Sequence, residues 1–484
     1  MQQYFPYAAA VVTAVLVVLA GGRWFRRTAW RLGLIDGPKL RGVHAEPVAK
    51  SGGMAVVTAL VASLLVQMMV ARALDLPESY LTDTNHLYLL LPAFAIAGLG
   101  LMDDLRPLGA AAKLAVQAAA GVVAWFLDFK IDFVNLAGFA HFSFDWMSLP
   151  LTVIFIVAVI NAYNMIDGVD GLCSGAAFIA LFGIGMYSTT GGELRLELAL
   201  PLGVAALTFL RFNLGKPKTF LGDSGSMFLG FMVATLALRA VVEPLETTSG
   251  TQAFELQVVP LFLLLSLPVV DITMVFFRRL IQGSSPLRAD RGHIHHILML
   301  LFNGNSQRTT GTLLFMAALG AAGAVWMDIN LWLAGVAIAL PLGLYLAVYA
   351  IGGYLNPRNL RNAGAATDCA EQLARQAAES GAHAALTDAT LIEWMQLGDV
   401  TAIALFSDEG ERVWSVGVPD LQRGSLNIPL YASGRVERGH LVLQGRGRPG
   451  ALAFAAHLAL PLYPAFMELL AIQTADKTLI ETRV

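Results

Sequence analysis

Four short polar clusters interrupt an otherwise apolar chain. They are DDLRPLGAAAK at 103–113, NAYNMIDGVDG at 161–171, FLGDSGS at 220–226 and DRGHIHH at 290–296. Carboxylates without sulfur neighbours suit a hard cation, Mg²⁺ or alternatively Mn²⁺, rather than zinc. Arg and His donors beside such a cation suit a pyrophosphate. The set therefore predicts metal-assisted phosphoryl transfer, which needs positioning and charge neutralisation more than covalent chemistry.

Each cluster also has a simpler interpretation. The Asp103–Asp104 pair could end a membrane span, and the Asn/Asp series could cap a helix. Gly222–Gly225 resembles a plain turn, and His295–His296 could lie in a solvated loop. The joint interpretation is favoured because ionisable groups at membrane depth are costly and usually functional.

The elements that must position these groups are membrane spans. Hydrophobic residues make up 56% of the 484 residues and charged residues only 14%, well below the quarter typical of soluble proteins. About eleven stretches approach the roughly 20 apolar residues that cross a bilayer. They lie near 4–22, 53–72, 88–102, 110–127, 147–163, 173–189, 197–212, 226–242, 257–276, 311–327 and 330–350. We expect an all-α polytopic membrane protein whose first span is retained rather than cleaved.

Loop charge predicts the orientation of these spans. RWFRRTAWRLGLIDGPKLRG, NLGKPKTF and FFRRLIQGSSPLRADRGHIHH are basic, whereas DLPESYLTDTN and VVEPLETTSGTQAFE are acidic. Because excess Lys and Arg marks the cytoplasmic side, we expect the N-terminus outside, and the C-terminus and all four clusters in the cytoplasm. The side of the mixed loop 128–145 follows only from counting spans.

The composition changes after the last expected span. A stretch rich in Gly and Asn leads into alternating runs, VTAIALFS and ERVWSVGV, then a hairpin-like pair, SLNIPLYAS and GHLVLQG, and an apolar helical stretch. We predict a transmembrane domain at 1–353 and a small cytoplasmic α/β domain at 354–484. The order of its elements is similar to a GAF-type sensor domain, with a regulatory or an assembly role left open.

In order and spacing, the four clusters resemble those of the polyprenyl-phosphate N-acetylhexosamine-1-phosphate transferases. This membrane family also includes the peptidoglycan MurNAc-pentapeptide translocase. The resemblance covers about residues 1–350 and extends, more weakly, to DGPKLRGVHAEPVAKSGG at 36–53. It implies ten or eleven transmembrane helices and a cytoplasmic active site at a bacterial inner membrane. The implied reaction joins undecaprenyl phosphate to a UDP-sugar and releases UMP.

The resemblance also implies roles for individual residues. Asp103 and Asp104 correspond to paired aspartates near the lipid phosphate, and Lys113 to a basic residue at the same site. Asp223 corresponds to the principal Mg²⁺ ligand, with Asp104 as a second candidate ligand. Other matching positions are expected at the nucleotide, the pyrophosphate or the catalytic centre: Asn161, Asn164, Asp167, Asp170, His44, Arg291, His293, His295 and His296.

The form HIHH resembles the hexosamine branch, and the peptidoglycan branch's G-T-P-x-M-G-G loop is missing. UDP-GlcNAc is therefore the first expected donor, with another UDP-N-acetylhexosamine or UDP-MurNAc-pentapeptide as alternatives. Two features depart from the family pattern: Lys50 stands where Arg is commoner, and the C-terminal domain is additional. We expect lipid and nucleotide-sugar partners and no nucleic acid; a homodimer remains open.

Competing classes leave different marks. The chain has no G-x-x-x-x-G-K-[ST] loop of a P-loop ATPase and no H-E-x-x-H of a zincin-type protease. A transporter of an anionic nucleotide or lipid is the alternative from another class. Such transporters usually show repeated halves with matching broken helices, and this sequence shows no such repeat. Release of UMP would separate the two classes.

Overall fold

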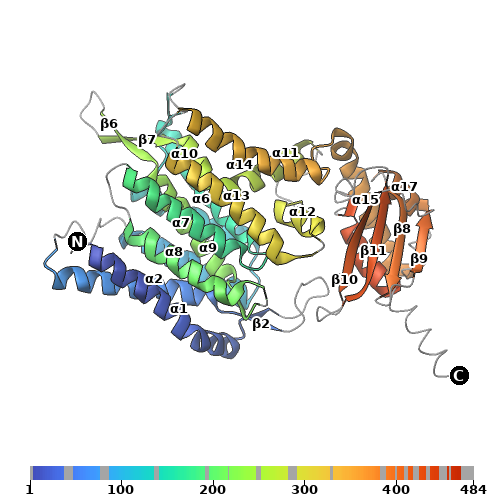
Figure 1. Ribbon diagram of the computed structural model, residues 1–484, viewed down its shortest axis with the longest axis horizontal. Helices are drawn as coiled ribbons and strands as arrows, with labels where there is room; N and C mark the ends of the chain where they lie inside the picture. The colour runs from blue at the N-terminus through green and yellow to red at the C-terminus, as the bar shows by residue number, and fades with distance from the viewer. Residues whose placement is uncertain are drawn as a thin grey trace. The chain divides into compact units, whose positions relative to one another are not determined.

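The computed structural model consists mainly of helices (Figure 1). It describes residues 4–36, 47–76, 87–135, 141–190, 196–215, 217–246, 252–281, 292–302, 304–326, 331–381, 389–397, 400–407, 412–417, 424–431, 437–445, 455–456 and 459–469. Contacts between Cα atoms divide the chain into two compact units. Among the described residues, the first unit holds 4–36, 48–270 and 310–343, and the second holds Pro47, 271–309 and 344 onward.

Apolar helices account for all of the expected spans. Their bounds are α1 (Phe5–Leu32), α2 (Gly52–Ala73), α4 (Leu90–Leu105), α5 (Ala110–Phe126), α6 (Ser148–Ile166), α7 (Leu172–Thr190), α8 (Leu196–Asn213), α9 (Asp223–Ala240), α10 (Val258–Leu264), α11 (Ser266–Ile281), α13 (Ser306–Trp326) and α14 (Leu331–Ile351). Each predicted range falls on one of these helices or on the pair α10–α11, which bends by 95°.

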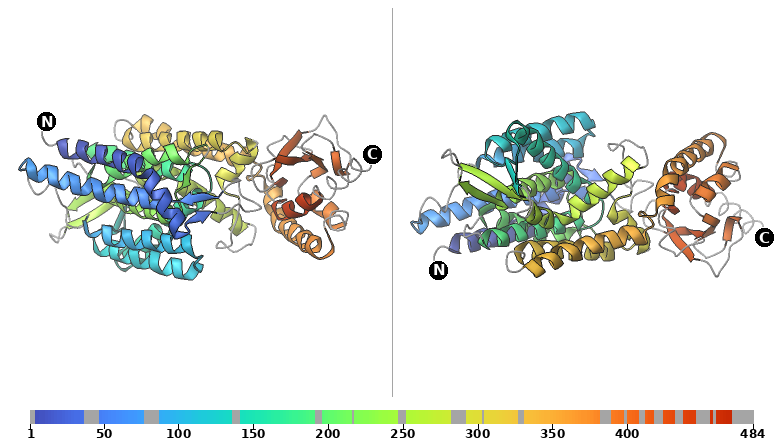
Figure 2. Two further views of the ribbon diagram at one scale, coloured as in Figure 1. Left: turned by 90° about the horizontal axis from the view of Figure 1, so that it is seen from below. Right: turned by 90° about the horizontal axis from the view of Figure 1, so that it is seen from above.

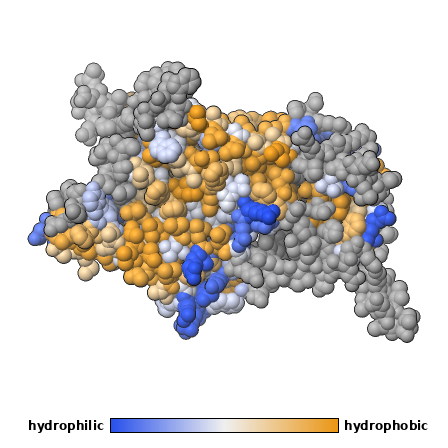
Figure 3. Space-filling view, in the orientation of Figure 1, coloured by the Kyte–Doolittle hydropathy of each residue, from blue (hydrophilic) through white to orange (hydrophobic). Residues whose placement is uncertain are grey.

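Only some of these helices meet a strict length and hydropathy requirement for crossing a membrane. Within the described residues four do so, Phe5–Leu32, Gly52–Ala73, Asp145–Ile166 and Ser306–Trp326, or five if the bent pair counts as one span. Large apolar side chains are nevertheless exposed along the helices, for example Met69 at 71% and Leu91 at 74%. Apolar residues cover much of the surface over α2, α7 and α8 (Figure 3). The expected number of eleven spans stays a prediction.

Helix α9 is the core of the first unit. Every residue from Ser224 to Leu238 is buried, and α9 packs against α2, α4, α6 and α7. A helix that is apolar on all sides needs burial in a protein core or in lipid, and here other helices surround it. The start of α9 is therefore held by its neighbours, which is where the third polar cluster lies.

Close approach of α4 to the start of α9 depends on a glycine. A Cβ atom at Gly100 would overlap the backbone of Asp223 and Ser224, so a larger residue would push the two helices apart. Gly100 precedes Asp103 and Asp104 by about one turn. The packing of α4 on α9 thus brings the first cluster to the third, and Figure 2 shows α5 beside α4.

Two small sheets lie at opposite ends of the first unit's helices (Figure 1). One has the order β1 (Ile35–Asp36), β2 (Val48–Lys50) and β5 (Thr219–Phe220), with β2 and β5 parallel. The other has the order β4 (His141–Ser143), β3 (Phe133–Asn135), β7 (Gln252–Gln257) and β6 (Val242–Glu246). Pairing of β3 with β7 joins the described part of loop 128–145 to the segment that follows α9. The side of the membrane on which this loop lies stays a prediction.

The C-terminal segment contains the expected strands. The second unit contains α12 (Ile294–Leu301). It also contains α15 (Pro357–Ser380) and α17 (Ala389–Leu397), which follow α14. They accompany an antiparallel sheet of order β10 (Gly424–Tyr431), β11 (Glu437–Gly445), β8 (Val400–Ser407) and β9 (Arg412–Gly417). The predicted hairpin is β10–β11. The likeness to a GAF domain and the boundary at 353/354 stay predictions.

Candidate active site

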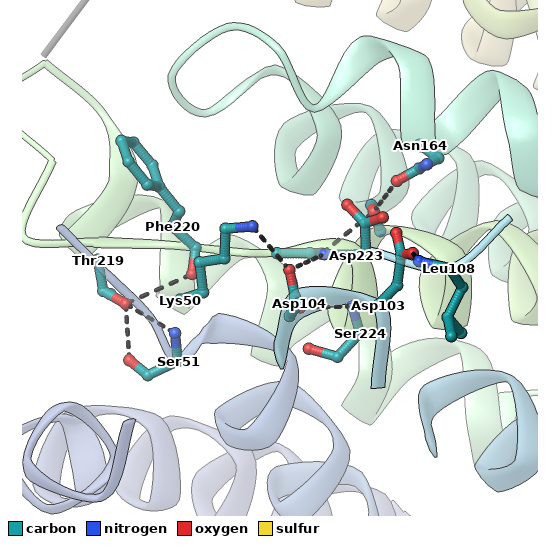
Figure 4. A network of polar contacts seen from close by, with 12 residues as sticks. Lys50, Ser51, Asp103, Asp104, Leu108, Asn164, Thr219, Phe220, Asp223 and Ser224 are labelled. Carbon is teal, nitrogen blue, oxygen red and sulfur yellow. Dashed lines mark hydrogen bonds and ion pairs between the residues drawn. The ribbon is translucent and has the colours of Figure 1, made fainter. Parts of the chain in front are cut away.

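The acidic cluster of the first unit forms around the first residue of α9. Gly222 precedes Asp223 with φ of 77°, a left-handed conformation that favours glycine. A Cβ on Gly222 would also lie 2.7 Å from Oδ2 of Asp104. Gly222 therefore lets the chain enter α9 directly against the carboxylate of Asp104. Figure 4 shows Asp104 beside Asp223, the first residue of that helix.

Asp104 holds the start of α9. Its side chain is fully buried, Oδ1 accepts the N–H of Asp223 and Oδ2 accepts the N–H of Ser224, both at 3.1 Å. The first N–H groups of a helix lack partners within the helix, and a carboxylate stabilises them electrostatically. Asp104 thereby links the end of α4 to the beginning of α9.

Lys50 is the charged partner of Asp104. Its Nζ lies 3.0 Å from Asp104 Oδ1. Although burial alone would lower the pKa of Lys50, the charge and hydrogen bond of Asp104 raise it above its ordinary value. The β2–β5 pairing fixes Lys50 opposite Phe220, and Thr219 Oγ1 donates to Ala49 O at 2.8 Å. Figure 4 shows Lys50 reaching Asp104 from this strand.

Lys113 joins Asp103 to Asp223. Its Nζ lies 2.8 Å from Asp103 Oδ2 and 3.7 Å from Asp223 Oδ2. Asp103 Oδ1 accepts the N–H of Leu108 at 2.7 Å, which fixes the turn between α4 and α5. The side chain of Asp223 is 27% exposed, so it is the more accessible of the two carboxylates.

The electrostatics of this cluster show a shortage of positive charge. Burial, a hydrogen bond with Asp103 and the negative charge of Asp104 raise the pKa of Asp223 to about 7. Burial and the charges of Asp223 and Asp104 also raise the pKa of Asp167, at the end of α6, well above its ordinary value. A divalent cation would relieve this repulsion and keep the carboxylates ionised.

The carboxylates are of the kind that binds Mg²⁺ together with a phosphate-bearing ligand. No described group of three or more His, Cys, Asp or Glu side chains has the arrangement of a complete protein-only metal site. Mg²⁺ is commonly bound through one or two carboxylates together with water and substrate phosphates. Asp223, with Asp103 or Asp104 beside it, provides a donor set of that kind.

The Asn/Asp series contributes to the same region. Ser226 Oγ, in the first turn of α9, donates to Asn164 Oδ1 at 2.8 Å. Asn161 donates instead to Gln117 Oε1 of α5 at 2.7 Å, and so joins α6 to α5. The side chain of Asp170 is buried, and its backbone oxygen accepts the hydroxyl of Thr310 at 2.8 Å.

The histidine cluster belongs to the second unit. His293 precedes α12, its ring stacks on His295 at 5.7 Å between centroids, and the ring of His296 lies 4.2 Å from that of His295. Burial lowers the pKa of His295 to about 4, so this ring is neutral near pH 7. Its buried Nδ1 has no hydrogen-bond partner in the described part of the chain.

The structure thus brings Asp103, Asp104 and Lys113 of the first cluster together with Asp223 of the third. His44 and Arg291 lie outside the described residues. Sequence reasoning noted Lys50 only as a departure from a family pattern and missed its pairing with Asp104. It also missed Asp271, whose signal was a lone acid within the expected span 257–276.

Comparison with known proteins gives a family match over the part of the chain that holds the acidic clusters. The family model described as glycosyl transferase family 4 matches residues 86–241, which include the first three clusters. The chain is 32% identical over 292 residues to a probable undecaprenyl-phosphate N-acetylglucosaminyl 1-phosphate transferase of Bacillus subtilis, covering 60% of this chain and 76% of that protein.

Two further relatives have similar descriptions. A decaprenyl-phosphate N-acetylglucosaminephosphotransferase of Mycolicibacterium smegmatis is 29% identical, over 66% of this chain and 82% of its own length. The undecaprenyl-phosphate alpha-N-acetylglucosaminyl 1-phosphate transferase of Escherichia coli K12 is 29% identical, over 60% and 76%. With the acidic clusters inside the matched region and three quarters of the Bacillus subtilis protein covered, this chain belongs to glycosyl transferase family 4.

Proposed function

We propose that the protein transfers N-acetylglucosamine 1-phosphate from UDP-GlcNAc to undecaprenyl phosphate and releases UMP. The observation that carries this proposal is the Asp103–Lys113–Asp223 cluster at the start of the buried helix α9. The names of the relatives support the same acceptor class and sugar phosphate. The product would begin a lipid-linked glycan.

The reaction requires one bond to form and one to break. An oxygen of the lipid phosphate attacks the phosphorus that bears the sugar, and the bond from that phosphorus to the bridging pyrophosphate oxygen breaks. UMP departs with the bridging oxygen. A phosphate monoester has a second pKa of about 6, so the attacking group is mostly dianionic at neutral pH and needs no strong general base.

Each residue of the cluster has a physical role in this step. Asp223, with Asp104 or Asp103, would hold Mg²⁺, which neutralises the pyrophosphate and the departing charge when bound. Lys113 provides positive charge beside Asp103 and Asp223, where the phosphates would lie. Asp103 and Lys113 orient the lipid phosphate, and Asn164 and Asp167 line the nucleotide end. His295 and His296 serve the donor pyrophosphate.

The cellular setting is part of the proposal. The protein would cross a bacterial inner membrane about eleven times, with its active site and C-terminal domain in the cytoplasm, as the loop charges predict. An active site at that surface could receive one substrate from the lipid and the other from water. The C-terminal domain would regulate or assemble the enzyme rather than build the reaction site.

A panel of UDP-sugars tests the function directly. Purified protein in detergent, with undecaprenyl phosphate and Mg²⁺, should release UMP from UDP-GlcNAc faster than from other UDP-N-acetylhexosamines. Turnover of UDP-MurNAc-pentapeptide but not UDP-GlcNAc would reverse the choice of donor. Transport of a nucleotide or lipid by protein that releases no UMP would favour the transporter instead. Asp223→Asn serves as the matched inactive control.

A further inference from the structure

Asp271 is a buried acid that the reaction described above does not use. It lies in α11, and only 3% of its surface is exposed. Its carboxylate accepts three hydrogen bonds. Oδ2 lies 2.9 Å from Nδ1 of His293, and Oδ1 accepts the N–H of Ile294 at 2.7 Å. The hydroxyl of Tyr349, in α14, donates to Oδ1 at 2.9 Å.

This arrangement makes Asp271 an organiser of the histidine cluster. A buried carboxylate is tolerated when donors surround it, and here two of the three donors come from consecutive residues at the start of α12. The third donor, Tyr349, ties the same carboxylate to another helix. With its oxygens occupied in this way, Asp271 is suited to holding other groups rather than to touching a substrate.

Arg278 holds the residue before His293 from the same helix. Its Nη1 donates to Gly292 O at 3.1 Å, and its guanidinium lies 5.3 Å from the ring centre of Tyr354. A Cβ on Gly292 would overlap that guanidinium. Asp271 and Arg278 are two helical turns apart and so share a face of α11. Arg278 and Asp271 thereby hold the backbone at Gly292 and at Ile294, on both sides of His293.

The bond from Asp271 determines which edge of His293 is left for a ligand. An ionised carboxylate only accepts hydrogen bonds, so Nδ1 of His293 must carry the proton that it shares with Asp271. Nε2, on the opposite side of the ring, is then the atom left to meet another group. In its protonated form an imidazole donates a hydrogen bond from Nε2–H to an anion.

We propose that Asp271 is a positioning residue for phosphate recognition: it holds His293 so that Nε2 contacts an anionic phosphate oxygen of the nucleotide-sugar donor. This inference rests on the proposed function and assigns to the Asp271–His293 pair a part in it. The proposed role of Asp271 differs from a purely structural one. The charge of Asp271, and not only its hydrogen bonds, would affect binding of the donor.

Several other groups lie close to His293 and could affect the rate of a variant. Tyr349 approaches from α14, Arg278 from α11, and His295 and His296 from α12. His295 is neutral near pH 7. To assign an effect of Asp271→Asn to His293, the same substitution is therefore repeated in a His293→Ala chain.

The experiment compares Asp271→Asn with Tyr349→Phe. Both variants disturb the same hydrogen-bond group, but only Asp271→Asn removes the charge. We expect Asp271→Asn to lower kcat/KM for UDP-GlcNAc by about 10- to 100-fold, as loss of a partner behind a functional histidine does elsewhere. The affinity for UDP-GlcNAc, measured by calorimetry, should fall in parallel, with no matching fall in Tm. Tyr349→Phe should keep nearly the wild-type rate and affinity.

A double-mutant cycle decides whether Asp271 acts through His293. In a His293→Ala background, Asp271→Asn should have little further effect on kcat/KM. The inference is overturned if the two losses multiply, or if Asp271→Asn keeps the wild-type rate and affinity. It is also overturned if Tyr349→Phe loses as much rate as Asp271→Asn with equal falls in Tm. Wild-type protein that releases no UMP would instead refute the proposed function. UDP-GlcNAc affinity, measured by calorimetry, would then decide the inference by the same comparison of variants.

Discussion

The buried carboxylate of Asp104 accepts the backbone N–H of Asp223 at 3.1 Å, so an acid at the end of α4 holds the first residue of α9. The same carboxylate pairs with Lys50, whereas its neighbour Asp103 pairs with Lys113. Two consecutive aspartates therefore face different partners. Asp104 connects three elements of the fold, and Asp103 lies with the more exposed Asp223 and Lys113.

Asp104→Ala should destabilise the fold more than Asp103→Ala does. The change leaves two helix N–H groups and the half-buried Lys50 without their acceptor, a loss on the order of 3 kcal/mol. Tm in detergent with EDTA measures this without any contribution from bound metal. Asp104→Asn, which keeps one acceptor oxygen, should lie between the wild type and Asp104→Ala. Equal Tm values for Asp104→Ala and Asp103→Ala would contradict the anchoring role.

Turnover should require Mg²⁺ or Mn²⁺ and stop in EDTA. The reason is the set of mutually repelling carboxylates that raises the pKa of Asp223 to about 7. Asp223→Asn removes a ligand charge with little change in volume, so it should lose most turnover while Tm stays near the wild-type value. UMP release by metal-free protein at the full rate would remove the metal from the mechanism. A near-normal rate in Asp223→Asn would place the metal elsewhere.

Acid should destabilise the protein partly through His295. Burial lowers its pKa from 6.5 to about 4, so between these values the unfolded chain binds more protons than the folded one. His295 therefore makes stability fall as pH drops from about 6.5 towards 4, by up to about 1.4 kcal/mol per pH unit. Above pH 6.5 it contributes no slope. In His295→Gln the dependence of Tm on pH should be shallower in this window, and an unchanged slope would show that His295 is not the group responsible.

Truncation after Tyr354 should leave a protein that inserts into the membrane and releases UMP. The four polar clusters all precede Ile297, and Tyr354, whose ring contacts Arg278, is retained. The cut removes the hydrogen bond from Asn359 Nδ2 to Gly353 O, so a modest fall in Tm is expected. Asn359→Ala in the full chain controls for that bond. A truncated protein that is folded and binds UDP-GlcNAc but has no turnover would show that the C-terminal segment takes part in catalysis.

The sequence by itself determined the apolar helices and the polar clusters between them. Long runs without charge predict helices, because a chain in lipid must satisfy its backbone hydrogen bonds internally. Asp103, Asp104 and Asp223 are conspicuous among these apolar runs, because a charge at membrane depth is costly and usually functional. The alternating runs and the hairpin-like pair predicted the strands of the C-terminal segment, and the hairpin is β10–β11. β8 is buried along most of its length rather than at alternate residues.

Only the tertiary structure decided which partner each charge has. Asp104 and Asp223 are 119 residues apart, and nothing in the local pattern indicates that one accepts the N–H of the other. Lys50 reaches Asp104 because β2 pairs with β5, and Asp271 reaches His293 because α11 packs beside the start of α12. A hydrogen bond depends on distances of about 3 Å between atoms, which close packing of distant segments sets and residue type alone does not.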